Sequence, residues 1–147
     1  MMSNLSKLKW RDVEAEFGEK VDQIREDVRQ MEDNPNYRDE PVDPKLVLLL
    51  ESHPHLAILE GWKSLEKAIV DLSVSRLQTE RRLPFNKHLD ALMRAEILPN
   101  SMKSALGEIR DVRNRAVHES DQTISKGRAY VLLDSIADIV GFLNKLV

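Results

Sequence analysis

The chain has no cysteine, few glycines and prolines, few aromatic residues and no long apolar run. Without cysteine it forms no disulfide and offers no thiolate to a metal ion, which fits a reducing compartment. No unbroken apolar run exceeds five residues, as at positions 46–50, whereas a membrane-spanning helix needs about 20. No hydrophobic signal-peptide core precedes a small-residue cleavage site. We therefore expect a soluble cytoplasmic protein with no membrane span.

The residues that are present have the composition of a charged helical bundle. Apolar residues make up 41% of the 147 positions and charged residues 32%, as in a soluble globular domain. This length suits one domain with a core of four or five helices. Five glycines and six prolines fit long helices joined by short connections.

Charge is distributed unevenly along the chain. Residues 1–11 carry +3, residues 12–43 carry −8 and residues 44–147 carry +2, giving the net charge of −3. The acidic residues thus lie in an N-terminal appendage, and the main domain is weakly basic. A weakly basic domain is compatible with a polyanionic ligand but does not require one.

Residues 1–33 contain an amphipathic acidic helix, predicted from about Trp10 to Glu32. Its apolar residues recur at intervals of four and three, in the narrow stripe of a coiled-coil seam: Phe17, Val21, Ile24, Val28 and Met31. A helix this polar needs a partner for its stripe, which is either its own bundle or a second chain. Residues 34–43, with two prolines and three acids, form a linker.

Residues 44–147 read as an all-α bundle of five helices. The spacing of apolar residues and the Asp43-Pro44, Pro54, Pro99 and Ser101 boundary signals predict helices over 44–51, 54–76, 86–98, 101–118 and 125–146. No useful segment alternates with period two, so we expect no sheet. The predicted core contains Trp62, Leu65, Ile69, Leu106, Ile109, Ile136 and Leu143.

The densest polar cluster lies at the end of the 101–118 helix. On an ideal helix Arg110, Asn114 and His118 form one stripe, whereas Arg113 lies about 140° around the axis from His118. Arg113 and His118 therefore meet only if the helix ends or distorts near His118, or if they come from two chains.

The string from Ile109 to His118 (IRDVRNRAVH) resembles the signature of the HEPN superfamily, an arginine and a polar residue followed by a histidine. It stands on the helix before the final one, as in that family. The helix from Pro54 and the segment LKWRDVEAEFGE at 8–19 resemble an uncharacterised bacterial HEPN-like branch. In that branch the latter segment often follows a transmembrane helix.

The resemblance implies a metal-independent endoribonuclease without a cofactor, often a toxin or anti-phage effector. In that mechanism a 2′-hydroxyl of RNA attacks the adjacent phosphorus. His118 would move protons, because its ordinary pKa is about 6.5. Arg113 would clamp the phosphate through its planar fork, and Asn114 would orient His118 or the phosphate. The family also implies a homodimer with a composite site, and often a nucleotidyltransferase-like antitoxin.

The same residues have an ordinary structural interpretation. Arginine and histidine near a helix C-terminus favour the helix dipole, and Arg113 could pair with Asp111 or Glu119. The chain would then be a non-catalytic HEPN-like binding or assembly module. Weaker RNA-binding candidates are Arg110 and Arg115 on the motif helix and the basic stretch Arg76, Arg81, Arg82 and Lys87.

The remaining histidines and Trp62 carry less information. His53 and His55 are two residues apart and point to different faces of a helix, so a metal site is not expected there. His88 is expected to face solvent, and Trp62 to lie in the core.

Overall fold

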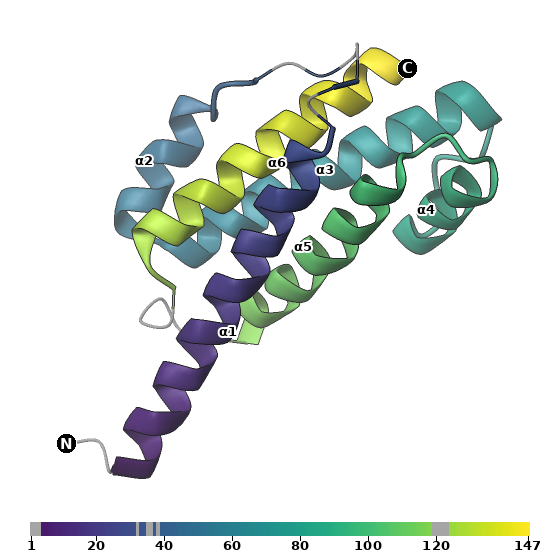
Figure 1. Cartoon of the computed structure of the whole chain (residues 1–147). Helices are drawn as coiled ribbons and strands as arrows, with labels where there is room; N and C mark the ends of the chain where they lie inside the picture. Colours follow the sequence, from purple (N-terminus) through teal and green to yellow (C-terminus); the bar gives the residue numbers. More distant parts are fainter. Residues whose placement is uncertain (1–3, 32, 35–36, 38, 119–123) are drawn as a thin grey trace.

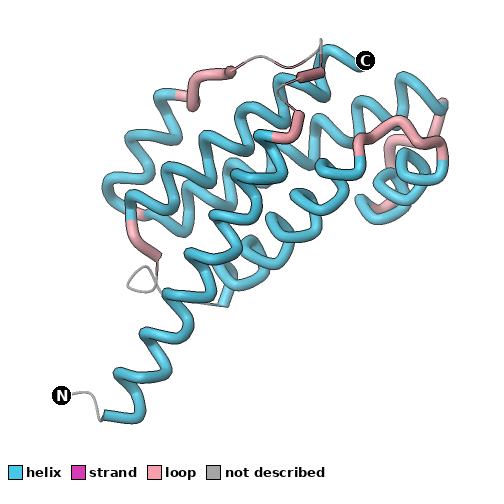
Figure 2. Tube along the Cα trace, viewed as in Figure 1, coloured by secondary structure: helices cyan, strands magenta, loops and turns pink. Residues whose placement is uncertain are grey.

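The computed structural model describes residues 4–31, 33–34, 37, 39–118 and 124–147, with side chains for all of these except 4–14 and 118. The described residues form six α-helices and no strand (Figures 1 and 2), which confirms the all-α prediction. The helices are α1 (Asn4–Arg29), α2 (Pro44–Ser52), α3 (Pro54–Leu77), α4 (Phe85–Arg94), α5 (Asn100–His118) and α6 (Lys126–Leu146).

Local signals in the sequence set most helix boundaries. Asp43 caps α2 by accepting the N–H of Lys45 at 2.9 Å, and Pro44 follows in the first turn. Ser125 caps α6 by accepting the N–H of Arg128 at 3.2 Å. Because such caps depend on neighbouring residues alone, these boundaries lie within a residue or two of the predicted ones.

Helix α4 ends at Arg94, four residues before its predicted end at Leu98. Glu96 takes a left-handed conformation with φ of 56°, the N–H of Ile97 bonds to the carbonyl of Leu92, and that of Glu96 to the carbonyl of Met93. This is a Schellman motif, which normally has glycine at the left-handed position. The turn lets Leu98 enter the core, where it is buried.

Helices α3 and α6 pack along each other at the centre of the bundle (Figure 1). Helix α1 packs on α5 and α6, α4 packs on α3, and α2 packs on α3 and α6. All seven residues predicted for the core are buried. No helix in the described part of the chain is long and apolar enough to span a bilayer.

The apolar stripe of α1 packs inside its own chain. Its five members, Phe17, Val21, Ile24, Val28 and Met31, are each at most 4% exposed. At Gly18 an added Cβ would lie 2.0 Å from the guanidinium of Arg128 on α6, so the absence of a side chain lets Arg128 lie against α1. The stripe therefore has its partner within the bundle and is not available to a second chain.

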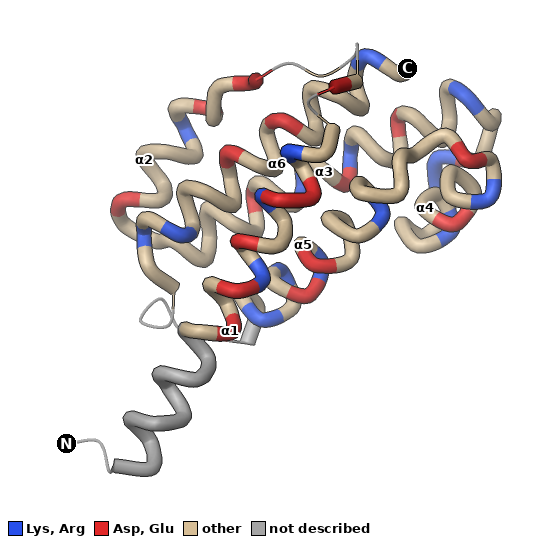
Figure 3. Tube along the Cα trace, viewed as in Figure 1, with Lys and Arg blue, Asp and Glu red and all other residues tan. Residues whose placement is uncertain are grey.

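The segment before α2 is bound to α6 through Asp138. The backbone N–H of Glu40 donates to Oδ1 of Asp138 at 2.8 Å, and the Tyr37 hydroxyl lies 3.2 Å from its Oδ2. Asp138 is buried, and this burial, together with nearby Asp134 and Asp39, raises the pKa of its carboxyl group. Acidic positions are frequent along α1 and in this segment (Figure 3).

The expectation that His88 faces solvent is wrong. Its side chain is fully buried between α4 and α3. Its Nδ1 lies 3.1 Å from both the Ser73 and Thr79 hydroxyls, and its Nε2 lies 3.3 Å from the carbonyl oxygen of Arg81. These partners satisfy the imidazole, and they are supplied by the neighbouring helix and loop, so no local pattern around His88 reveals them.

Candidate functional site

Helix α5 turns the predicted motif residues away from the core. Its inward face is fully apolar and buried, with Met102, Ala105, Leu106, Ile109, Val112 and Ala116. The polar residues between them must therefore face α1, the edge of α3, α4 or solvent. Figure 1 shows α5 lying between α1 and the α3–α4 pair.

Arg113 lies against α3 and is half-buried. Its Cζ is 6.0 Å from the centre of the Trp62 ring, which is cation–π distance. Its Nη1 donates to Oδ1 of Asn114 at 2.9 Å, and its Nε is buried without a hydrogen-bond partner. Trp62 is 5% exposed, as predicted for a core residue, and its indole N–H donates to Glu66 at 2.9 Å. Two side chains thus restrict the position of the Arg113 guanidinium.

Arg110, about one turn before Arg113, also lies at cation–π distance from an aromatic ring. Its Cζ lies 6.0 Å from the centre of the Phe85 ring, at the start of α4. The rings of Phe85 and Trp62 meet edge to face, with centres 5.2 Å apart. We call Trp62, Phe85, Arg110 and Arg113 the aromatic–arginine cluster. Phe85 was not predicted as a site residue, because its contact with Arg110 joins segments distant in the sequence.

The other charged residues of the motif bind α1. Arg115 forms an ion pair with Glu16, while Lys20 bridges Glu108 at 3.1 Å and Asp111 at 3.3 Å. The hydrogen bond to Glu108 is the main cause that raises the pKa of Lys20. Asp111 therefore pairs with Lys20 and not with Arg113. The opposite sides of α5 have different roles, one holding α1 and the other carrying the aromatic–arginine cluster.

His118 is the last residue of α5. Its side chain, and residues 119–123 with the predicted polar break and Glu119, lie outside the described residues. The backbone is α-helical from Asn100 through His118, so positions 113 and 118 lie about 140° apart around one axis. The helix is therefore not distorted between Arg113 and His118, but it does end at His118, so a meeting through the helix end and a meeting across two chains both stay open.

Most of the basic stretch is engaged within the chain. Arg81 pairs with Asp71 at 2.7 Å and Arg82 with Glu80 at 2.8 Å. Arg76 donates to the backbone carbonyl of Leu146 at 3.0 Å, and Lys87 is exposed. These contacts favour a solvated surface that also ties α3 to its neighbours.

No group of three or more histidine, aspartate or glutamate side chains that could hold a metal ion occurs in the part of the chain that the structure describes. His53 is exposed and His55 is half-buried at the start of α3.

Comparison with known proteins gives one match. The model of a family described as a domain of unknown function (DUF4145) matches residues 46–147, which include α3 to α6 and nearly all of α2. No curated protein and no solved structure matches the chain. The matched region contains the aromatic–arginine cluster and the motif, and it leaves out α1.

Proposed function

The chain belongs to the DUF4145 family, whose description names no activity, and we propose that it is a metal-independent endoribonuclease whose site forms between two copies of the chain. The observation that carries this proposal is the aromatic–arginine cluster. Arg110 and Arg113 lie on one side of α5, each placed over an aromatic ring, on the helix that ends in His118. A guanidinium at cation–π distance from a ring keeps in-plane N–H donors for phosphate oxygens.

The chemistry follows from RNA itself. His118 takes the proton of a 2′-hydroxyl, the 2′-oxygen bonds to the adjacent phosphorus, and the bond from phosphorus to the 5′-oxygen breaks. A histidine in the acid form gives a proton to the leaving 5′-oxygen. Arg113 balances the charge of the pentacoordinate phosphorus, and the products are a 2′,3′-cyclic phosphate and a 5′-hydroxyl.

A second copy of the chain would bring a His118 side chain to Arg113. Positions 113 and 118 face different directions on one straight helix, so Arg113 of one copy would act with His118 of the other. A homodimer also provides two histidines, one for each proton transfer. Val117 is 50% exposed and lies one turn from Arg113, which gives the same end of α5 an apolar surface for such a contact.

The biological setting is proposed from the HEPN resemblance. A bacterial, cytoplasmic toxin or phage-defence effector would need control in its own cell, for which a nucleotidyltransferase-like antitoxin is the partner that the resemblance implies. RNA is the substrate in either setting.

A non-catalytic binding or assembly module is the second candidate. It is favoured by the half-burial of Arg113 and its hydrogen bond to Asn114, and by the pairing of Arg115 with Glu16. These contacts would serve to fix α5 in the bundle. The two candidates differ in one measurable respect, because a module binds RNA or protein without breaking a phosphodiester bond.

The deciding experiment compares wild type with His118→Ala, using His53→Ala as the matched control because His53 is an exposed histidine outside α5. We expect wild type and His53→Ala to cleave mixed RNA in the presence of a chelator and to leave cyclic phosphate ends. His118→Ala should lose cleavage while retaining its helical circular dichroism. Intact RNA with wild type over a range of pH would remove the nuclease proposal, and binding without cleavage would favour the module.

A further inference from the structure

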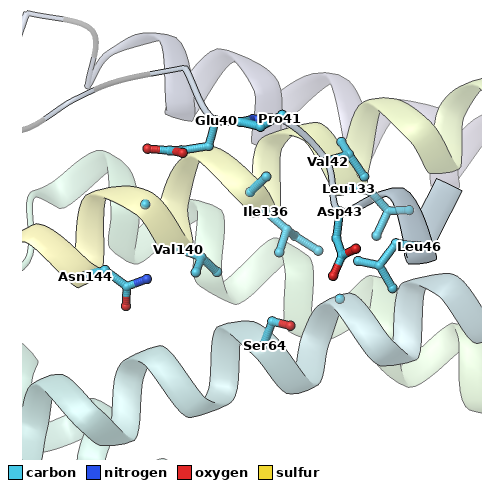
Figure 4. A pocket seen from close by; sticks show the side chains of 13 residues that line it. Glu40, Pro41, Val42, Asp43, Leu46, Ser64, Leu133, Ile136, Val140 and Asn144 are labelled. Atoms are coloured by element: carbon cyan, nitrogen blue, oxygen red, sulfur yellow. The ribbon is translucent and has the colours of Figure 1, made fainter.

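A cavity separate from the motif lies between α2, α3 and α6. It has a volume of about 220 Å³. Figure 4 shows it as a trough along α6, with the 40–43 segment over one edge and α3 opposite. The apolar wall is formed by Leu133, Ile136 and Val140 of α6, while Gly61 and Ser64 of α3 face it.

The two carboxylates of the trough lie toward its opposite ends. Figure 4 places Asp43 beside Leu46 at the start of α2, and Glu40 at the end where Asn144 lies. Oδ1 of Asp43 caps α2. No lysine, arginine or histidine lines the cavity, and neither carboxylate forms an ion pair within the described residues.

The lack of a side chain at Gly141 leaves room for Glu40 beside α6. A Cβ added at Gly141 would lie 2.4 Å from Cγ and 2.9 Å from Oε1 of Glu40, so only glycine lets Glu40 lie this close to α6.

We propose that this trough binds a linear aliphatic diammonium compound. One ammonium group would bind Glu40 and the other Asp43, with the methylene chain along Ile136 and Val140. The Cα atoms of Glu40 and Asp43 are at most about 10 Å apart along three residues of chain. The Glu40 side chain extends away from Asp43 (Figure 4), which widens the gap between the carboxylates enough for a chain of about five carbons with an ammonium contact at each end. Ser64 and Asn144 would add neutral oxygen acceptors. This site is independent of the proposed nuclease activity.

The test is a titration of the ¹⁵N-labelled full chain with 1,5-diaminopentane, followed through the amide signals of its glycines. Gly61 and Gly141 report on the two walls, whereas Gly107 and Gly127 lie outside the cavity lining and serve as internal controls. We expect saturable shifts at Gly61 and Gly141 with a roughly millimolar dissociation constant, as suits a small ligand, and weaker binding at high salt. The neutral analogue 1,5-pentanediol should not produce them.

Variants distinguish the contribution of the two carboxylate charges to binding from that of the shape of the trough. Glu40→Gln and Asp43→Asn should each weaken binding about threefold to tenfold, and asparagine retains the cap of α2. Ser64→Leu should abolish binding by filling the trough. Equal shifts with the diol, equal shifts at Gly107 and Gly127, or unchanged affinity in both charge variants would overturn the proposal. The diol and glycine comparisons use wild type and do not depend on variant folding.

Discussion

Arg113 combines two demands that only arginine meets. Its guanidinium lies over Trp62 at 6.0 Å and donates to Asn114, and the proposed reaction also requires it to bind phosphate oxygens. Arg113→Lys keeps the charge but loses the planar fork and its hydrogen bond geometry. We expect RNA cleavage to fall at least about 100-fold, as for other losses of transition-state charge stabilisation. Cleavage rates and circular dichroism would check this, with Arg82→Lys on the exposed surface as the control that leaves cleavage unchanged.

Asp138 makes stability depend on pH in a predictable direction. Burial raises the pKa of its carboxyl above the ordinary 3.8, so the folded state favours the protonated form. The stability that this group contributes is therefore complete below 3.8 and is lost as pH rises through the folded pKa. Asp138→Asn keeps an oxygen to accept the Glu40 N–H and does not ionise.

We therefore expect Asp138→Asn to gain stability relative to wild type as pH rises from below 3.8 to 7. Asp138→Ala should instead cost about 1–3 kcal/mol, because the buried Glu40 N–H loses its acceptor. Urea unfolding at several pH values measures both, with the exposed Asp90→Asn as the control. A constant difference between Asp138→Asn and wild type across pH would contradict the assignment.

At the scale of elements, the end of α4 carries a residue poorly suited to its backbone. Glu96 has φ of 56°, a conformation that costs an L-residue roughly 1–2 kcal/mol. Glu96→Gly should raise the free energy of unfolding by about 0.5–1 kcal/mol, while Lys87→Gly inside the same helix should lower it by about 1 kcal/mol. Chemical denaturation gives both values, and destabilisation by Glu96→Gly would show that its side chain has an unrecognised role.

Helix α4 shows why the positions of the helices could be predicted from the sequence better than the contacts between them. The spacing of apolar residues and the capping residues depend only on nearby sequence. The helices at 44–52, 54–77 and 100–118 could therefore be predicted from the sequence nearly to the residue. The end of α4 could not, because nothing but tertiary packing of Leu98 favours a left-handed glutamate. His88 was misplaced for a related reason, since the hydroxyls of Ser73 and Thr79 that satisfy it come from elsewhere in the chain.

For the whole molecule, the sequence left open whether the α1 stripe serves the bundle or a second chain. Packing on α5 and α6 answers this, because only the assembled bundle has a groove for Ile24, which is fully buried. The α1 stripe therefore no longer supports the predicted homodimer, which had two observations in its favour. The other is the separation of positions 113 and 118 by about 140° around α5, and on it we base the proposal of a second copy.

A site shared between two copies can be tested by complementation. In a two-fold dimer with composite sites, a mixed dimer of Arg113→Ala and His118→Ala chains has one site with both residues intact and one with neither. If the two inactive chains exchange freely, half of the dimers are mixed, and activity should recover to about a quarter of wild type. A site that also needs the second histidine as acid would recover less.

The measurement is RNA cleavage by each variant alone and after the two are unfolded and refolded together, with sedimentation to establish the dimer. A mixture of His118→Ala with His118→Ala/Arg113→Ala is the control that should stay inactive, since neither chain supplies the histidine. A monomer at micromolar concentration, or a dimer whose mixture stays inactive although wild type cleaves, would exclude the shared site. Arg113 and His118 would then be assigned separate roles, since their positions lie about 140° apart around α5.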